Sequence, residues 1–271
     1  RYRQLRPTLA IPADEVIALE GVTSCGLHPS LAGLTSFWQQ GRLALIQGIG
    51  FAAPNRSHFV SMDRWWHADD LGAPGWLGRV LDELSSEPSP LFATALGSGA
   101  PLLNGRRVQP TVISSPGSFR WVGLEPEWIG ALGDDPAAAD LAGAARHAFH
   151  RTLQAVDEFS VVTGGEPTGD ELPEREGGST LAAGLAVAAQ LLAADVGTQL
   201  VVVSAGGFDT HANQLPVHAE LLADLADGLV AFHAAIEAAG LADQVMVVGT
   251  SEFGRRVAQN ASGGCDHGAG G

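Results

Sequence analysis

The most constraining feature of this sequence is the alternation of Val-rich runs and long helical segments in its last third. Residues 199–204 and 244–250 are short, continuous apolar runs, and helical patterns cover residues 179–195 and 216–239. Continuous apolar strands are typical of sheets covered by helices on both faces, and a strand–helix–strand order implies parallel strands. The sequence therefore predicts an α/β fold with a mostly parallel central sheet flanked by helices.

Weaker signals in the first part of the chain add further elements. Helical spacing of apolar residues predicts a helix over residues 28–40, and the apolar run at 43–49 is consistent with a buried strand. Ser57 has the position of an N-cap for a helix that extends to Trp66. These elements precede a less regular middle region.

The middle of the chain contains one strand-like stretch, at residues 111–114, and one well-marked helix, at residues 135–159. That helix starts with an Asp cap followed by proline, which suits the first helical position. Residues 164–178 form an acidic loop rich in Pro and Gly. We expect one domain over residues 1–271, with a less regular, cap-like insertion at roughly 72–178.

Composition narrows the possible partners. The formal net charge is −15, and every one of the 15 basic residues is arginine. Clusters of basic residues that bind phosphate backbones are absent, so we expect no nucleic-acid partner. No apolar run reaches the roughly 18 residues of a membrane span. The two cysteines, Cys25 and Cys265, are too few for a disulfide framework, so we expect free thiols, with a single bridge as the alternative in an exported protein.

Polar residues follow each predicted strand of this sheet. In an open parallel sheet, ligands bind outside the carboxyl ends of the strands. An Asn-Arg-Ser-His segment at 55–58 follows the strand at 43–49, and a Gly-Gly-Phe-Asp-Thr-His segment at 206–211 follows the strand at 199–204. Glu252 and, after a Gly/Ser-rich loop, His267 follow the strand at 244–250. We therefore expect these groups to meet at one edge of the sheet.

Asp209 and His211 are the first pair of candidate metal ligands. They are two residues apart, so their side chains point the same way in an extended segment. A carboxylate with an imidazole favours Zn or Mn, whereas an all-oxygen shell would suit Ca or Mg. The alternative is a turn in which Asp209 caps the next segment and His211 is solvated. Beside Glu252 and His267, we favour the divalent metal site.

Glu252 and His267 are the remaining candidate ligands. A carboxylate directly after a buried strand needs a partner, and for Glu252 this is either a metal or one of Arg255 and Arg256. His267 lies in a Gly-rich surround that suits a ligand or a turn. We expect Asp266 to hold the His267 ring from a position behind it, and Arg255 to support the site.

Ser57 is the candidate nucleophile. The positive end of a helix dipole binds oxyanions and would stabilise an alkoxide, and the neighbouring Arg56 could clamp the anion's oxygens. The alternative is that Ser57 is only an N-cap. His58 is adjacent to Ser57, so we expect it to point away from Ser57 and to support the site; Ser61 is the alternative nucleophile.

Six segments of the sequence resemble a known bacterial family, the domain-of-unknown-function family 1501. They are RPTLAIP (6–12), GLHPSLAGL (26–34), NRSHFVSMDRWW (55–66), GGFDTHANQ (206–214), SEFGRRVAQN (251–260) and DHGAGG (266–271). The resemblance spans nearly the whole chain, and GGFDTH, SEFGRR and DHG in that order are its most specific motifs.

The resemblance implies an alkaline phosphatase/sulfatase-like fold and export by the twin-arginine route to the periplasm or beyond, although no signal is present in this chain. It implies Ser57 as the nucleophile and Asp209, His211, Glu252 and His267 as ligands of a divalent metal. The implied reaction is metal-assisted hydrolysis of a phosphate or sulfate ester, small or polymer-borne. The alternative is a non-catalytic exported binding or assembly protein on the same fold.

The chain departs from the superfamily pattern in three ways. Phe253 stands where phosphatase-like relatives carry a histidine after an aspartate, which argues against a full two-metal site. No Cys/Ser-x-Pro-x-Arg motif of the sulfatases surrounds Ser57. The resemblance also places a Gly-rich strand upstream of Arg1 and further chain beyond Gly271, so we expect a sheet that is incomplete at both termini.

Overall fold

The described part of the chain is a mixed α/β structure with a three-stranded parallel sheet, and the sequence predicts this class and strand direction. The structure is a computed structural model, and it describes residues 1–68, 70–85, 88–120, 141–164 and 181–268. The chain divides into two units, the first made of residues 1–73, 180–186 and 205–271 and the second of residues 74–179 and 187–204. Each unit is described by itself. The predicted single domain with a cap-like insertion at 72–178 stays a prediction.

The second unit contains the sheet, in the strand order β4 (Thr111–Ile113), β3 (Ala93–Leu96) and β5 (Leu200–Val203). Both strand pairs are parallel, and all four residues of β3 are buried. A central strand buried on both faces explains the small and apolar residues of β3. The sequence predicts β4 and β5 but not β3, because the Ala-Thr-Ala-Leu run of β3 lacks the Val-rich character of β5.

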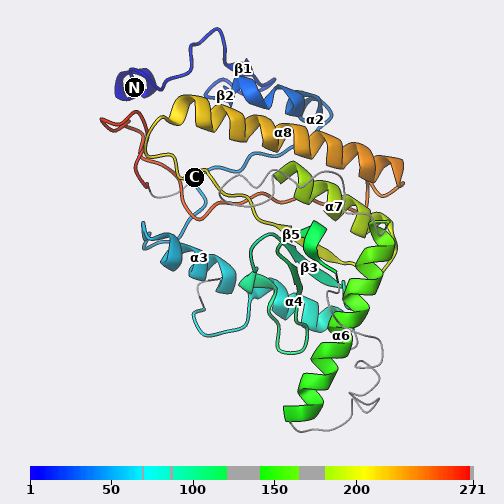
Figure 1. Cartoon of the computed structure of the whole chain (residues 1–271). Coiled ribbons are helices and arrows are strands. Elements are labelled where there is room, and N and C mark those ends of the chain that lie inside the picture. The colour runs from blue at the N-terminus through cyan, green and yellow to red at the C-terminus, as the bar shows by residue number, and fades with distance from the viewer. Residues whose placement is uncertain (69, 86–87, 121–140, 165–180, 269–271) are drawn as a thin grey trace. The chain divides into compact units, whose positions relative to one another are not determined.

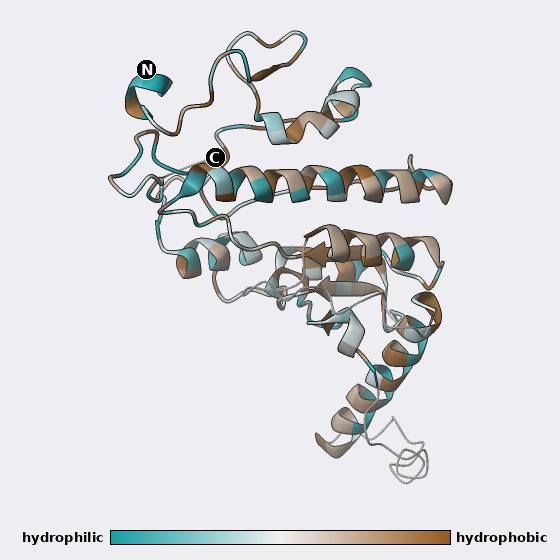
Figure 2. Cartoon of the chain, turned by 45° about the horizontal axis from the view of Figure 1, so that its top comes forward, coloured by the Kyte–Doolittle hydropathy of each residue, from teal (hydrophilic) through white to brown (hydrophobic). Residues whose placement is uncertain are grey.

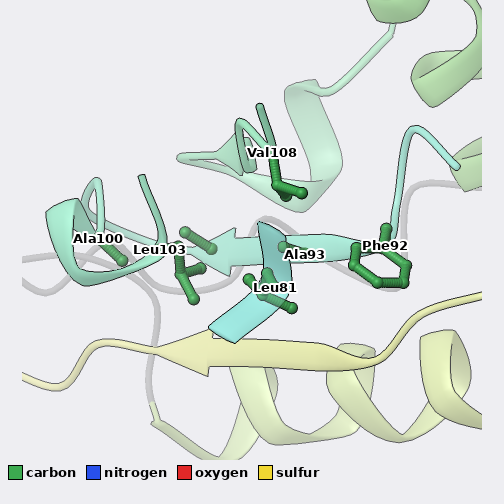
Figure 3. Close-up of a cluster of buried hydrophobic side chains, with 7 residues drawn as sticks. Leu81, Phe92, Ala93, Ala100, Leu103 and Val108 are labelled. Atoms are coloured by element: carbon green, nitrogen blue, oxygen red, sulfur yellow. The ribbon is translucent and has the colours of Figure 1, made fainter. Parts of the chain in front are cut away.

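The core of the second unit packs where α4 (Trp76–Leu84) meets β3 and the 3-10 helix η2 (Pro101–Leu103). Figure 3 shows Leu81 of α4, Leu103 of η2 and the loop residue Val108 converging on the strand. Each of the three side chains is at most 1% exposed. Burying a leucine of this kind stabilises the unit by roughly 1.5–3 kcal/mol.

Three further elements complete the described part of this region: the 3-10 helix η3 (Pro116–Ser118), α6 (Leu141–Val162) and α7 (Leu181–Ala193), whose first residues belong to the first unit. Much of α7 is hydrophobic, as Figure 2 shows. α6 and α7 match the predicted helices at 135–159 and 179–195 in type. The predicted start of the earlier helix and nearly all of the acidic loop at 164–178 lie outside the described residues.

The first unit is organised around the long helix α8 (Gln214–Ala238), which packs against the 3-10 helix η1 (Pro29–Leu34) (Figure 1). Hydrophilic and hydrophobic residues alternate along α8 (Figure 2). The other elements of the unit are short: α1 (Tyr2–Leu5), the antiparallel pair β1 (Ile17–Ala18) and β2 (Gly26–Leu27), α2 (Thr35–Gln39) and α3 (His58–His67). A Cβ on Gly228 would lie 3.0 Å from the Cα of Ala182, so glycine allows α8 to approach the start of α7.

The predicted helix at 28–40 is corrected to η1 followed by α2. Leu31 has non-helical backbone angles (φ −95°, ψ 16°), which interrupt a continuous α-helix. Leu31 and Leu34 are three residues apart, a spacing that suits a 3-10 helix as well as an α-helix because residues i and i+3 stack in the tighter form. The prediction of a helix here is therefore right in position and right in type for α2, and it is wrong in type for η1.

The two strands predicted at 43–49 and 244–250 are not strands in the structure. Ile46 is 76% exposed and Met246 is 84% exposed, so neither run is buried. A strand exists only with a neighbour to share its backbone hydrogen bonds, and these runs form no ladder with other described residues. The apolar character of these two runs therefore predicted strands, but it could not show whether a neighbouring strand would share their backbone hydrogen bonds.

Two further expectations concern the whole chain. No helix in the described part of the chain has the combined length and hydrophobicity needed to cross a bilayer. Both cysteines are free thiols, with Cys25 exposed and Cys265 buried, which confirms the expectation of unpaired cysteines.

Candidate metal centre

Three segments of the first unit, distant in sequence, bring their polar side chains together. The first is the Asn-Arg-Ser turn that enters α3, and the second is the loop at 206–213 that leads into α8. The third is the segment at 252–267, closed by an isolated antiparallel bridge between Arg255 and His267. The site therefore lies entirely within one unit.

Asp209 and His211 lie on the same side of the loop before α8. Asp209 Oδ1 is 2.9 Å from His211 Nε2, whereas Thr210 between them is buried, at 7% exposed. The backbone here makes two successive γ-turns, with hydrogen bonds from Thr210 N to the Phe208 carbonyl and from His211 N to the Asp209 carbonyl, so the predicted extended segment is corrected while residues two apart still share a side. A carboxylate and an imidazole nitrogen thus face the same space.

His267 joins this pair. Its Nε2 lies 2.9 Å from Asp209 Oδ1 and 2.9 Å from His211 Nε2. Its Nδ1 donates a hydrogen bond to the backbone carbonyl of Arg56, at 2.7 Å. Because a carbonyl oxygen can only accept, Nδ1 carries a proton, and in the neutral ring the Nε2 lone pair is available to a metal.

His58 lies among the metal-binding residues and not in the supporting position that the sequence predicts for it. Its Nε2 lies 3.2 Å from His267 Nε2 and 3.3 Å from Asp209 Oδ2, at the point where the other groups meet. Its Nδ1 donates to Glu252 Oε1 at 2.5 Å. His58 is the first residue of α3, and the direction of such a side chain depends on how the helix enters the fold. The sequence carries one signal for this role, because His58 belongs to the same polar run, residues 55–58, as Ser57.

His58, Asp209 and His267 form a group that could hold a metal ion, because one ligand atom of each lies within 4.8 Å of the others. His211 borders this group through its contacts with Asp209 and His267. Each of the three imidazoles has an oxygen near its Nδ1, from Glu252 (2.5 Å), Asp266 (3.4 Å) or the Arg56 carbonyl (2.7 Å). Such outer partners are typical of metal-binding histidines, because they orient the ring and leave Nε2 free to bind.

Arg255 neutralises part of the charge in this cluster. Its guanidinium contacts Asp209 Oδ1 and donates to the carbonyls of Phe208 (3.0 Å) and Cys265 (2.9 Å). Burial would raise the pKa of Asp209, but the hydrogen bond and the positive charge of Arg255 outweigh it and hold that pKa well below its usual range. Asp209 is therefore a carboxylate at neutral pH and can act as a ligand.

Glu252 and Asp266 contact the rings of histidines rather than the convergence point itself. Glu252 was predicted as a ligand, and the structure places it behind His58. Asp266 was expected to hold the His267 ring, but it lies beside His211 instead. The reason is that His267 is in a strand-like bridge, where neighbouring side chains point to opposite sides.

Ser57 occupies the N-cap position of α3, but its side chain makes no capping hydrogen bond. Its backbone N–H donates to Asn55 Oδ1 at 2.8 Å, and the residue is half-buried. Arg56 is exposed, and its carbonyl, not its guanidinium, contacts the cluster. Ser61 is 3% exposed and donates to the carbonyl of Asn55 at 2.7 Å, so its hydroxyl is already engaged. Of the two serines, Ser57 has the available hydroxyl.

Comparison with known proteins gives one match. The family model described as "Protein of unknown function (DUF1501)" matches residues 124–271, a little over half of the chain. This region includes Asp209, His211, Glu252 and His267, while His58 precedes it. Neither the curated proteins nor the solved structures gave a match.

Proposed function

This chain belongs to the DUF1501 family, whose function is unknown. We propose that it is a metal-dependent hydrolase of phosphate or sulfate esters. One observation carries the proposal. The Nε2 atoms of His58 and His267 meet the Asp209 carboxylate, and both rings are anchored through Nδ1. Imidazole and carboxylate groups that converge on one point, with their rings held from behind, can share a single cation.

The donor set favours zinc or manganese as the divalent metal. Imidazole nitrogens together with a single carboxylate suit these ions, whereas calcium and magnesium prefer shells of oxygen alone. A bound metal of this kind would act as a Lewis acid that polarises an ester oxygen. His58, Asp209 and His267 would hold it, and Arg255 would keep Asp209 ionised.

Ser57 is the proposed nucleophile because of its position between two residues of the site. Arg56, before it, holds the His267 ring through its carbonyl, and His58, after it, belongs to the metal-binding group. The Ser57 side chain is not used as a cap, and it stands at the start of a ten-residue helix, where the helix dipole favours negative charge. Arg56 has an exposed side chain that can contact the anionic group of the substrate.

The proposed reaction has two balanced steps. The Ser57 oxygen bonds to the phosphorus or sulfur atom as the bond to the alcohol oxygen breaks, and the hydroxyl proton leaves with the alcohol. Water then attacks the serine ester, which releases inorganic phosphate or sulfate and restores the serine hydroxyl. The substrate is an anionic ester, small or carried on a polymer.

The finer expectations drawn from the resemblance belong to the same proposal. We infer an alkaline phosphatase-like arrangement of the sheet, supported by the parallel strands β4, β3 and β5. We also infer that the protein acts outside the cytoplasm after export. The expected lack of a nucleic-acid partner rests on the net charge of −15.

The proposal is tested on the full-length protein by metal analysis and by turnover of aryl phosphate and aryl sulfate with zinc or manganese added. Metal-stimulated turnover that is lost in Ser57→Ala but kept in Ser36→Ala, an exposed serine on α2, supports it. His267→Ala should lose the metal, whereas His147→Ala on α6 should keep it. Metal binding with no turnover of either ester would favour the non-catalytic binding or assembly protein, and absence of metal binding would overturn the metal centre.

A further inference from the structure

Asn260 is a polar hub beside the metal-binding group, although the proposed function gives it no role. Its Nδ2 donates to the carbonyl of His211 at 2.9 Å and to Asp266 Oδ1 at 3.1 Å. Its Oδ1 accepts from the backbone N–H of Ser262 at 2.9 Å and of Gly264 at 3.0 Å. The Asn260 side chain therefore connects the loop at 260–264 to the backbone of His211, a candidate ligand, and to Asp266, which lies beside the His211 ring.

The four contacts of Asn260 use its amide in a single orientation. An amide oxygen accepts and an amide nitrogen donates, and both ends have partners that match this arrangement. A rotated amide would direct its N–H groups at two backbone N–H groups, so the observed orientation is the only one that satisfies the site. Asn260 therefore combines an acceptor for the loop with a donor for Asp266 and His211.

The loop approaches the backbone of His211 closely. A Cβ on Gly264 would lie 2.2 Å from the carbonyl carbon of His211, so the 260–264 loop is pressed directly against that residue. The loop is also closed by the backbone hydrogen bond from Asn260 N to the Gly264 carbonyl, at 2.8 Å. A movement of this loop would therefore shift His211.

The side chain of His211 is held from the same hub. Its Nδ1 lies 3.4 Å from Asp266 Oδ1, the oxygen that accepts from Asn260. Its Nε2 lies 2.9 Å from both Asp209 Oδ1 and His267 Nε2. Asn260 thus fixes His211 at its backbone directly and at its ring through Asp266.

We propose that Asn260 is a positioning residue that makes His211 the fourth ligand of the metal centre. The inference rests on the proposed metal site and adds to it the element that completes its coordination. His211 would supply a third nitrogen beside the Asp209 oxygen, which gives the four-coordinate shell that zinc prefers. Residues behind the ligands of such sites are needed for affinity nearly as much as the ligands are.

The test uses Asn260→Asp in the full chain. This change keeps the Oδ1 acceptor for Ser262 and Gly264 but removes the donor, and it sets a carboxylate against Asp266. We expect the dissociation constant for zinc, measured by competition with a chromophoric chelator, to rise about tenfold or more. With cobalt as the probe, the visible absorption of four-coordinate metal should weaken. Asn104→Asp, at an exposed position in the second unit, should change neither value.

A swapped pair separates positioning from folding. In Asn260→Asp with Asp266→Asn, the carboxylate and the amide exchange places, which restores the contact between residues 260 and 266 but not the donor to the His211 carbonyl. We expect the zinc affinity and the cobalt spectrum to recover part of the way toward those of the wild type. A swapped pair no better than Asn260→Asp alone would overturn the inference.

A cycle with His211→Ala gives a second, independent test. If Asn260 acts through His211, the two single variants lose similar affinity and the double variant loses no more than His211→Ala. Additive losses, or wild-type affinity in Asn260→Asp, would overturn the inference while leaving the metal centre intact. Absence of zinc binding by the wild type would overturn the proposed function and this inference together.

Discussion

Replacing Glu252 with glutamine tests whether the outer partner of His58 contributes to the metal centre. In the structure, Glu252 Oε1 accepts from His58 Nδ1 at 2.5 Å, and the two side chains are 28% and 35% exposed. Glutamine has nearly the same shape and its amide oxygen can still accept the proton. The substitution therefore removes the negative charge and leaves the contact.

The size of the effect follows from this change of charge. Hydrogen bonds to a charged group contribute about 1.5–3 kcal/mol and neutral ones about 0.5–1.5 kcal/mol, so the difference is about 1 kcal/mol. Partial exposure to solvent screens this value further. Because His58 would bind the metal through its other nitrogen, we expect zinc affinity to fall about two- to fivefold, since about 1 kcal/mol corresponds to about fivefold before screening.

Zinc affinity of the full chain, measured by competition with a chelator at neutral pH, checks this value. Glu20→Gln is the matched control, since Glu20 is an exposed glutamate of the same unit. The urea unfolding midpoint without metal should be nearly equal in both variants. Unchanged affinity in Glu252→Gln, or an equal loss in Glu20→Gln, would refute the assigned role of Glu252.

Three further predictions concern the stability of the protein, through Asp82 and Gly228, and the accessibility of its two cysteines. Asp82 accepts from the backbone N–H of Arg106, Arg107 and Val108, so Asp82→Asn should lower the unfolding free energy measured in urea by about 2–4 kcal/mol. Burial would raise the pKa of Asp82, but these hydrogen bonds lower that pKa overall. Ionised Asp82 should therefore contribute fully to the free energy of unfolding above the unfolded pKa of about 3.9, and this contribution should be lost as the pH falls further. Acid unfolding of the wild type and the variant would show the difference. Gly228→Val would place a Cβ 3.0 Å from the Cα of Ala182 and should cost about 1–3 kcal/mol in thermal or urea unfolding, and an unchanged midpoint would contradict this packing. Cys25 should react with a thiol reagent in the native protein and Cys265 only after unfolding, and equal labelling rates would contradict the burial of Cys265.

The helices of the last third could be predicted because their pattern is local. α8 begins two residues before its predicted start and ends one residue before its predicted end. The run at 199–204 became β5 because β3 lies beside it, and no apolar run of comparable length announced β3 in advance. The run at 244–250 is Val-rich like β5 but has no neighbouring strand among the described residues. Its conformation therefore depends on the rest of the fold and not on its own sequence.

The candidate site divides in the same way between local and distant information. The spacing of Asp209 and His211 predicted that they share a face, which is a property of any extended segment. That Asp266 would lie behind His211 and not behind His267 depends on the bridge at Arg255, which pairs residues far apart in sequence. The polar run at 55–58 marks His58 as a candidate, but its position among the metal-binding residues depends on Glu252, 194 residues away.

The large sequence separation between His58 and His267 would affect how the protein responds when the proposed metal ion is scarce. His58 and His267 are 209 positions apart, so an unfolded chain holds their nitrogens at unrelated distances, and chelation exists only where the first unit is built. An ion taken up there selectively lowers the free energy of the native ensemble, by an amount that grows with the logarithm of its concentration. Starvation for that ion would then expose the chain to proteolysis before any substrate is met.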